Sequence, residues 1–438
     1  MADFALCAET LSRSGSLSAV ALRARALLRC GHYGEALSAV SAIELDGAPD
    51  GCAAEILALR ASAFSLLNDH RAEATLVDAR ARAYSSGCAA VECEVEYLAA
   101  RLSWMEGRVV EALVGVERVL AVGHGPSWLD SGRAEPWRSA AYWRARAHEL
   151  RGVSEALRED YAAQAVSLMA AFEEFDSGPV IDLFAEASML RNLAILARDV
   201  ASPEIAEYVR SRSEAVAWNQ NTASLEFEVF RALGWSQARY GDHLGAFRYL
   251  RRSAEVAPSA ALRIRAIVDR TFLGHELGEN DAASYDFNLE VEIANGVNWD
   301  ELSGVERSTL YALAAGVAPI DPGQARRLID RYFSIESPVS PSEIFKRDRR
   351  QRADECSAHA AVLVAEGERE RAISLLQESF RIWSEVGYAW RAATVAADLA
   401  ELTGERRFFD VAAREAANQP HSWLARRLAA LETAHSAS

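Results

Sequence analysis

One short pattern constrains this chain more than any other: a glycine followed five positions later by an alanine. The clearest copies are Gly31 with Ala36, Gly107 with Ala112, Gly241 with Ala246, Gly278 with Ala283 and Gly367 with Ala372. A second small residue stands twelve positions before each alanine, as Ala24 does before Ala36. Two antiparallel helices need small side chains where they approach most closely, and glycine can adopt the left-handed conformation that ends the first helix. The pattern therefore predicts helix–turn–helix hairpins.

Weaker copies of the pattern fill the intervals between the clear ones. They are Asp69 with Ala74, Gly152 with Leu157 and Gly404 with Phe409, and the spacing adds anchors at Ala206 and Ala325. Together these positions predict about ten hairpins over nearly the whole chain. Each hairpin has one apolar face that it cannot bury by itself, so neighbouring hairpins are expected to stack into a continuous core. Half of the residues are hydrophobic, which is enough to build such a core.

The copy between residues 230 and 258 resembles the tetratricopeptide repeat (TPR). Its aromatic, Leu, Gly, Gly, Asp, Ala, apolar and Pro positions are filled by Phe230, Leu233, Gly234, Gly241, Asp242, Ala246, Leu250 and Pro258. The resemblance implies an all-α fold, a right-handed α-solenoid of about ten TPR-like hairpins. It also implies a protein that binds a peptide or another protein and has no catalytic activity.

The anchors Ala36, Ala74 and Ala112 are 38 residues apart, about one helical turn more than the usual 34. Units of this length resemble the TPR sensor arm of large LuxR-type bacterial transcription regulators, and quorum-sensing peptide receptors. Those regulators also carry an ATPase domain and a DNA-binding helix–turn–helix. This chain has a single lysine, Lys346, outside any phosphate-binding loop. The resemblance is thus limited to the sensor arm.

Turn-forming residues cluster at three places, 123–136, 176–179 and 337–341. Each is either a long loop or a hinge, and the prompt return of the repeat pattern favours loops. We therefore expect an N-terminal block at 1–170, a central block at 171–336, and a C-terminal block at 337–438 that ends in a capping helix.

Charge and composition exclude several classes of function. The net charge is −16, which argues against direct nucleic-acid binding, because such proteins need a positive face for the phosphates. Arginine replaces lysine almost throughout, which is typical of a GC-rich bacterial genome. The N-terminus lacks a secretory signal, and no apolar run is long enough to span a membrane. A cytoplasmic protein without membrane attachment is expected; the sequence does not indicate its oligomeric state.

No motif predicts a metal, a cofactor or a catalytic residue. The segments that begin at His148 and His275 start like a zinc-protease helix, but neither has the second histidine one turn later. The six cysteines contain no C-x-x-C pair. A hydrolase concealed in the irregular segment 120–220 remains an alternative, although no nucleophile and base can be paired there.

The first helix of each hairpin lines the groove in TPR arrays, so its outward positions can be projected from the anchors. The projected binding residues are Arg101, Trp104, Arg146, Arg191, Arg198, Arg231, Trp235, Arg239, Arg265, Phe272 and His275. Arg25 and Arg29 project to the same lining. Guanidinium groups beside aromatic rings suit an acidic peptide or a C-terminal carboxylate. Carboxylates project there too, among them Glu94, Glu149 and Asp199, so the lining is either a binding groove or an internal salt-bridge network.

The expected function is a bacterial, regulatory adaptor or sensor that binds a protein or peptide. The alternative is a ligand-responsive regulator that acts on transcription through a partner. A small rotation per repeat would suffice for such a response, given a ligand that binds one state better than the other.

Overall fold

The computed structural model describes residues 16–29, 32–67, 69–122, 139–158, 160–177, 182–200, 202–219, 222–276, 294–299, 302, 304–335 and 349–437. Within these ranges the chain forms twenty helices and no strand. Contacts divide the chain into two compact units, Met1–Asn192 and Leu193–Ser438. This division differs from the three blocks expected from the turn clusters. Most residues of the turn clusters lie outside the described ranges.

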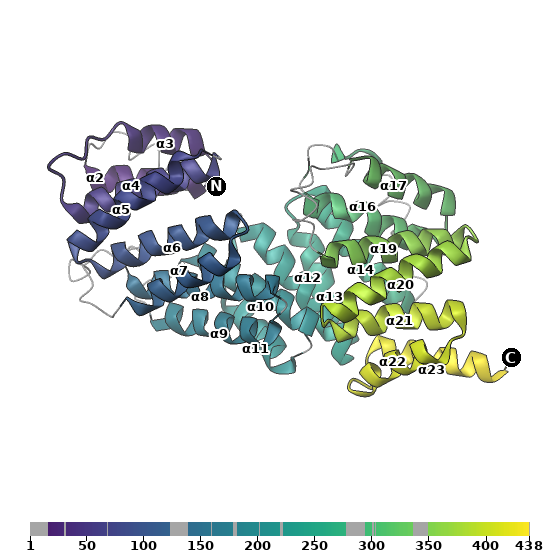
Figure 1. The fold of residues 1–438 in the computed structure, drawn as a ribbon. Coiled ribbons are helices and arrows are strands. Elements are labelled where there is room, and N and C mark those ends of the chain that lie inside the picture. Colours follow the sequence, from purple (N-terminus) through teal and green to yellow (C-terminus); the bar gives the residue numbers. More distant parts are fainter. Residues whose placement is uncertain are drawn as a thin grey trace. The chain divides into compact units, whose positions relative to one another are not determined.

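The first unit consists of hairpins whose helices follow one another in the chain (Figure 1). Its helices are α2 (Leu17–Arg29), α3 (Tyr33–Ser41), α4 (Asp50–Leu66), α5 (Arg71–Ser86), α6 (Ala89–Met105), α7 (Val109–Ala121), α8 (Ala140–Leu157) and α9 (Tyr161–Ser177). Helix α10 (Leu183–Val200) contains the boundary between the two units.

The second unit repeats this arrangement and ends in an extra helix (Figure 1). Its helices are α11 (Pro203–Ala215), α12 (Ala223–Tyr240), α13 (His243–Val256), α14 (Ala260–Glu276), α16 (Gly304–Val317), α17 (Pro322–Ile335), α19 (Arg349–Ala365), α20 (Arg369–Glu385), α21 (Ala389–Thr403), α22 (Arg406–Ala417) and α23 (Trp423–Ala437). The capping helix predicted at the end of the C-terminal block is α23.

Consecutive helices pack against each other as hairpins. The pairs are α2 with α3, α4 with α5, α6 with α7, α8 with α9, α12 with α13, α16 with α17, α19 with α20 and α21 with α22. Neighbouring hairpins then stack through their first helices, as α4 does on α6 and α16 on α19. The predicted all-α array of stacked hairpins is therefore confirmed.

Small residues lie at the closest approaches, as the pattern predicts. A Cβ atom added to Gly234 would stand 2.7 Å from the Cγ of Leu250, across the α12–α13 hairpin. In the α6–α7 hairpin a Cβ on Gly115 would stand 2.7 Å from the Cβ of Ala100. The anchor alanines Ala36, Ala112, Ala246 and Ala372 are completely buried. Steric necessity at these crossings explains why the spacing recurs.

The glycines between paired helices end the first helix as predicted. Gly241 has a φ of 84°, in the left-handed region, and the next residue, Asp242, donates its backbone N–H to the Gln237 carbonyl at 3.0 Å. Gly107 has a φ of 78° and precedes the same bond from Arg108 to Ser103, 2.9 Å long. These bonds satisfy carbonyls at the helix end that would otherwise lack a partner.

The prediction for the fourth hairpin is wrong, because Gly152 lies where the two helices cross and not in the turn between them. Gly152 lies inside α8, and Leu157 is 54% exposed, so this pair does not form the turn. A Cβ on Gly152 would stand 3.0 Å from Leu168 of α9. Gly152 therefore corresponds to Gly234, the small residue twelve positions before the anchor Ala246. The residue twelve positions after Gly152 is the buried Gln164, which takes the place of the anchor alanine. Glycine serves at both the crossing and the cap, which made the two positions indistinguishable in sequence.

Two other anchors are displaced by one or two residues. Ala74 is exposed, and Ala72 is buried instead; Phe409 is half-buried, and Phe408 is buried. In both hairpins a backbone hydrogen bond at the start of the second helix spans three residues instead of four. The Ala72 N–H donates to the Asp69 carbonyl and the Phe408 N–H to the Glu405 carbonyl, each at 3.2 Å. This tighter first turn shifts the buried face.

The anchors that were placed by spacing are confirmed where the structure describes them. Ala206 is 2% exposed and Ala325 is completely buried. Ala283 lies outside the described residues.

Candidate functional site

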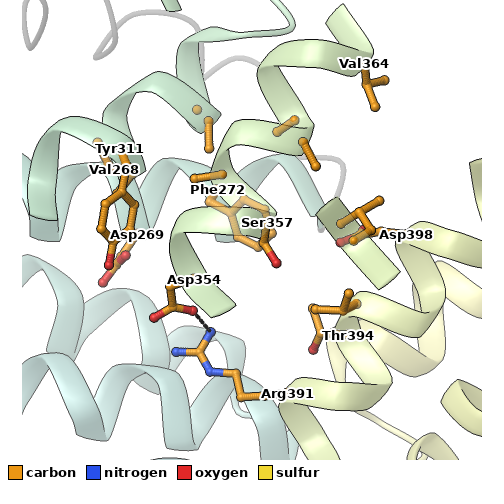
Figure 2. A pocket seen from close by; sticks show the side chains of 18 of the residues that line it. Val268, Asp269, Phe272, Tyr311, Asp354, Ser357, Val364, Arg391, Thr394 and Asp398 are labelled. Atoms are coloured by element: carbon orange, nitrogen blue, oxygen red, sulfur yellow. Dashed lines mark ion pairs between the residues drawn. The ribbon is translucent and has the colours of Figure 1, made fainter. Parts of the chain in front are cut away.

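The second unit contains a cavity of about 440 Å³ that several first helices line together (Figure 2). Its walls come from α12, α14, α16, α19 and α21, with contributions from α20 and the terminal helix α23. Because first helices of successive hairpins share this cavity, it lies on the side of the array where the sequence predicts a groove. We call it the groove.

The repeat register determines which residues face the groove. In α19 the lining residues Asp354, Ser357, Ala361 and Val364 stand at offsets of −6, −3, +1 and +4 from the buried Ala360. The same offsets from Ala397 in α21 give the lining residues Arg391, Thr394, Asp398 and Glu401. Offsets of three and four residues mark one face of a helix, so each helix presents one stripe to the groove.

Apolar side chains form much of the lining. Ala312, Ala315 and Ala358 contribute small methyl groups from α16 and α19. Phe272 is 37% exposed and Val364 is 41% exposed, both unusually high for large apolar residues in a helical core. The Phe272 ring lies 5.9 Å from those of Trp235 and Trp423. The groove therefore offers accessible apolar surface.

A buried ion-pair network occupies one end of the groove. Asp269 accepts a hydrogen bond from Arg231 at 2.5 Å and another from the Trp235 indole at 2.9 Å. Arg265 lies 3.6 Å from the other carboxylate oxygen and donates to the Ser308 carbonyl at 3.2 Å. Burial tends to raise the pKa of Asp269, but the charges of Arg231 and Arg265 outweigh burial, so this pKa is lowered. Asp269 is held as a carboxylate.

The terminal helix supplies a cation to the opposite end. Arg427 of α23 pairs with Asp398 and with Glu401, each at 2.7 Å. Burial raises the pKa of Asp398, and Glu401 raises it further, although Arg427 opposes both effects. This end of the groove therefore holds more negative charge than one guanidinium neutralises.

The middle of the groove holds one long ion pair. Arg391 stands 3.9 Å from Asp354, and both side chains point into the groove (Figure 2). Ser357 lies about one helical turn after Asp354 on α19, and Thr394 lies about one turn after Arg391 on α21 (Figure 2). These polar groups share a wall with the apolar residues, so the middle of the groove is amphipathic.

Residues far apart in the chain close the second unit. Arg239 at the end of α12 donates to Glu415 at 3.0 Å and to Gln419 at 3.1 Å, and its guanidinium lies 4.5 Å from the Trp390 ring centroid. Trp423 is 2% exposed and reaches both Phe272 and Trp390. Helix α23 is thus wedged between the first and last hairpins of the unit.

Several of the projected arginines belong to internal ion pairs. Arg25 pairs with Glu55 at 2.9 Å and with Glu94 at 2.6 Å in the first unit. In the second unit Arg198 pairs with its neighbour Asp199 at 2.6 Å. The salt-bridge network that the sequence analysis left open as an alternative is therefore present at these positions.

Other members of that network lie in the first unit. Arg29 donates to Asp182, which also accepts a bond from the Tyr142 hydroxyl at 3.1 Å. Arg146 pairs with Glu149. The Glu149 carboxylate also accepts bonds from Ser188 at 2.7 Å and Asn192 at 3.0 Å.

The structure brings three of the projected binding residues into the groove: Trp235, Arg265 and Phe272. Arg231 lies behind them on Asp269, and Arg239 lies in the contact with α22. Arg101, Trp104, Arg146 and Arg191 belong to the first unit, where Arg101 lines a recess of about 20 Å³. The His275 side chain lies outside the described residues.

Sequence reasoning missed most of the polar groove residues. It projected arginines and aromatic rings, and so passed over Tyr311, Asp354, Ser357, Thr394 and Asp398. The sequence could have predicted the lining residues of α19 and α21. Ala360 and Ala397 were placed correctly, and the offsets of −6, −3, +1 and +4 from them give these residues directly. It was absent for α16, where the lining residues Tyr311 and Ala315 do not follow the register that Ala325 implies.

The described residues show little that resembles a catalytic or metal site. No three His, Cys, Asp or Glu side chains gather there in a way that could hold a metal ion. Burial raises the pKa of Cys93 to about 12, which keeps this sulfur a thiol. None of the helices in these ranges combines the length and apolar character that a bilayer crossing requires.

No protein-family model matches the chain, and no curated protein matches it significantly. Among solved structures it is similar to a Rap protein in complex with competence and sporulation factor, with 13% identity, 86% of this chain and 98% of that chain covered, and a TM-score of 0.48. It is also similar to the Cut9–Hcn1 hetero-tetramer of the APC/C, with 12% identity, 95% of this chain and 82% of that chain covered, and a TM-score of 0.35. A third similar structure is the TPR domain of P58(IPK), with 14% identity, 90% of this chain and 98% of that chain covered, and a TM-score of 0.20. Likenesses at this level carry no argument about function. The resemblance to the LuxR-type sensor arm stays a prediction.

Proposed function

We propose that this chain is a non-enzymatic binding module whose second unit holds a peptide, free or part of a partner protein, in the groove. The observation that carries the proposal is the groove itself, an amphipathic cavity that four successive first helices, α14, α16, α19 and α21, build together. Its volume of about 440 Å³ falls within the range of ligand sites, roughly 300 to 1,000 Å³. Exposed apolar area beside a few fixed polar groups is the usual composition of such sites.

The chemistry of the lining favours binding over catalysis. Its residues include no histidine, cysteine or lysine, the side chains that most often act as bases or nucleophiles. Its carboxylates face guanidinium groups, and no base or nucleophile stands beside them in the lining. This arrangement supports recognition by shape and charge.

The finer parts of the sequence prediction belong to this proposal. A regulatory role in a bacterial cytoplasm rests on the composition and on the TPR resemblance. An acidic partner rests on the projected arginines, and the ion pairs of Arg231, Arg239 and Arg265 reduce the support for it. A ligand that shifts the contacts of α23 would make the module a regulator, which was the alternative function.

The test is to fill the groove without removing any ion pair. Ala361 is half-buried on the groove wall of α19, and Ala361→Trp places an indole in the cavity. Leu244→Trp, at a residue that is 85% exposed on α13, is the matched control. Each variant is used as bait in the cytosol of the native host, and the captured peptides and proteins are identified by mass spectrometry.

We expect the wild type and Leu244→Trp to retain the same partner, and Ala361→Trp to lose at least about nine tenths of it while its helical circular dichroism is unchanged. Equal capture by Ala361→Trp would show that the groove is not the binding site.

A further inference from the structure

We propose that the groove selects a peptide with a cationic side chain, arginine or lysine, next to an apolar one. This inference rests on the proposed function and specifies its ligand. It comes from three properties of the groove: the pairing of its charged groups, the hydrogen bonds of its hydroxyl groups, and the chemistry of Arg427, which already lies at one end.

The charged groups of the groove are unequally paired. Its lining contains four carboxylates (Asp269, Asp354, Asp398 and Glu401) and three guanidinium groups (Arg265, Arg391 and Arg427), and Asp269 is also paired with Arg231 from behind the lining. Two of the three guanidiniums have partners besides Asp354, and Arg391 has the 3.9 Å contact with Asp354. Arg427 serves two carboxylates and Arg265 serves Asp269 and a backbone carbonyl. An acidic ligand would have to break these pairs.

Asp354 has the weakest partner of the four carboxylates. Asp269 and Asp398 each have a guanidinium nitrogen within 2.7 Å, whereas the nearest nitrogen of Arg391 stands 3.9 Å from Asp354. Asp354 is also 29% exposed toward the groove. A ligand cation at this carboxylate would gain a charge-assisted bond and displace no short one.

The two hydroxyls beside Asp354 present acceptors only. Ser379 donates its proton to the Ala353 carbonyl at 2.8 Å, so Ser357, 2.8 Å from Ser379, must be the donor in that contact. Thr394 donates its proton to the Trp390 carbonyl at 3.0 Å. The protons of both groove hydroxyls are thus engaged, and their free lone pairs remain.

A groove wall that offers a carboxylate and two hydroxyl acceptors is suited to a group with several donors. Ammonium has three N–H donors and guanidinium has five, and neither has an acceptor. A carboxylate ligand would face lone pairs from Asp354, Ser357 and Thr394, with Arg391 as the single donor among these four residues. The middle of the groove is therefore an acceptor site for a cation.

The terminal helix provides an example of a cation in the groove. Helix α23 places Trp423 against the Phe272 ring and, one turn later, Arg427 on Asp398 and Glu401. Arg427 belongs to the groove lining, whereas Trp423 is 2% exposed and contacts the lining residue Phe272. The groove lining also contains the weakly paired Asp354 and the partly exposed Phe272 and Val364, which offer the same two kinds of contact without an occupant from the described chain.

One buried hydroxyl also points to a ligand. Thr271 lines the groove, is 3% exposed, and has no hydrogen-bond partner for its Oγ1 among the described residues. Buried hydroxyls are usually satisfied, because leaving one without a partner is unfavourable. A polar backbone group of a bound peptide would supply the partner.

The experiment uses pools of hexapeptides in which one central position is fixed as Arg, Lys, Glu, Asp or Ala and its neighbour as Leu, with the other positions randomised. Binding of each pool to the full-length protein is measured by fluorescence anisotropy. Asp354→Asn removes the charge and keeps the shape. Asp330→Asn is the matched control, because Asp330 also lies 3.9 Å from an arginine, Arg326, but on the exposed face of α17.

We expect the Arg and Lys pools to bind best, and Asp354→Asn to weaken them by about tenfold to a hundredfold, while Asp330→Asn leaves them unchanged. Preferential binding of the Glu, Asp or Ala pools would overturn the cationic ligand and leave the binding module intact. If no pool binds in a manner that Ala361→Trp abolishes, the proposed peptide-binding function fails as well.

Discussion

Replacing the helical glycines with alanine tests whether steric contact between paired helices explains the repeat. Within an open helix this change stabilises a protein by roughly 0.5–1 kcal/mol, because alanine restricts the unfolded chain more than glycine does. At a close crossing the added methyl group must instead displace its neighbour. Overpacking of this kind costs about 1–3 kcal/mol, and more when the neighbour is backbone.

The structure ranks three such sites. A Cβ on Gly115 would stand 2.7 Å from the Ala100 Cβ and 3.1 Å from its Cα, which cannot move without shifting α6. On Gly234 it would meet Leu250 at 2.7 Å and 2.8 Å and the Ala246 carbonyl oxygen at 3.2 Å. On Gly152 it would stand 3.0 Å from the Cγ and 3.1 Å from the Cδ2 of Leu168, and 3.5 Å from the Gln164 carbonyl oxygen.

We therefore expect Gly115→Ala to lower the free energy of unfolding by about 1–2 kcal/mol after the helical gain is subtracted, and Gly234→Ala by about 1 kcal/mol. Gly152→Ala should be nearly neutral, because its closest contact, at 3.0 Å, is the longest of the three and a shift of a few tenths of an ångström relieves it. Gly34→Ala is the control, because nothing lies within 4 Å of the added atom, and it should stabilise by about 0.5 kcal/mol.

The assay is urea unfolding followed by circular dichroism at the helix band. Local stability of the α6–α7 and α12–α13 hairpins is measured in parallel by hydrogen exchange, because repeat arrays can unfold in parts. If Gly115→Ala stabilised the protein as much as Gly34→Ala does, the steric explanation of the pattern would be refuted.

Two further predictions concern charge. Asp269→Asn leaves Arg231 and Arg265 buried without a counterion and should lower the free energy of unfolding by about 3–5 kcal/mol; an unchanged urea midpoint would contradict the network as drawn. Burial, and then the charges of Arg326 and Arg371, lower the pKa of His359, so the unfolded chain binds a proton there at a higher pH than the folded protein does. Stability should therefore fall as the pH drops below about 6.5, and the fall should be smaller in His359→Gln; identical pH profiles would exclude this contribution.

The elements that could be predicted from sequence are those that local sterics determine. A left-handed residue at Gly107 or Gly241 and a small residue at Ala100 or Gly234 are required by the hairpin itself, and they recur at fixed spacing. The register failed where one residue type serves two purposes. Gly152 fills a helix crossing, and the turn after α8 forms around Arg158 and Asp160 without needing glycine.

The site was less predictable, because a side chain's outward position does not reveal its partner. Arg231, Arg239 and Arg265 were all placed on a groove-facing helix. Whether each is available to a ligand depends on Asp269 and Glu415. For Arg231 and Arg239 these partners come from other hairpins, and for Arg265 the partner Asp269 lies one turn later on the same helix. The reverse error affected Asp354 and Thr394, which face the groove but drew no attention as isolated polar residues.

The contact between α12 and the last helices explains why an open array was the wrong basis for projecting the groove. Arg239 reaches Glu415 and Gln419 over 176 and 180 residues, and His421 packs so closely on Gly241 that a Cβ there would stand 2.6 Å away. These bonds join the first and last hairpins of the second unit, so α23 enters the groove and Arg427 becomes part of its lining. A repeat pattern reports only contacts between neighbours. Since the shape and charge of this groove depend on a contact between its two ends, they follow from the three-dimensional structure and not from the repeat.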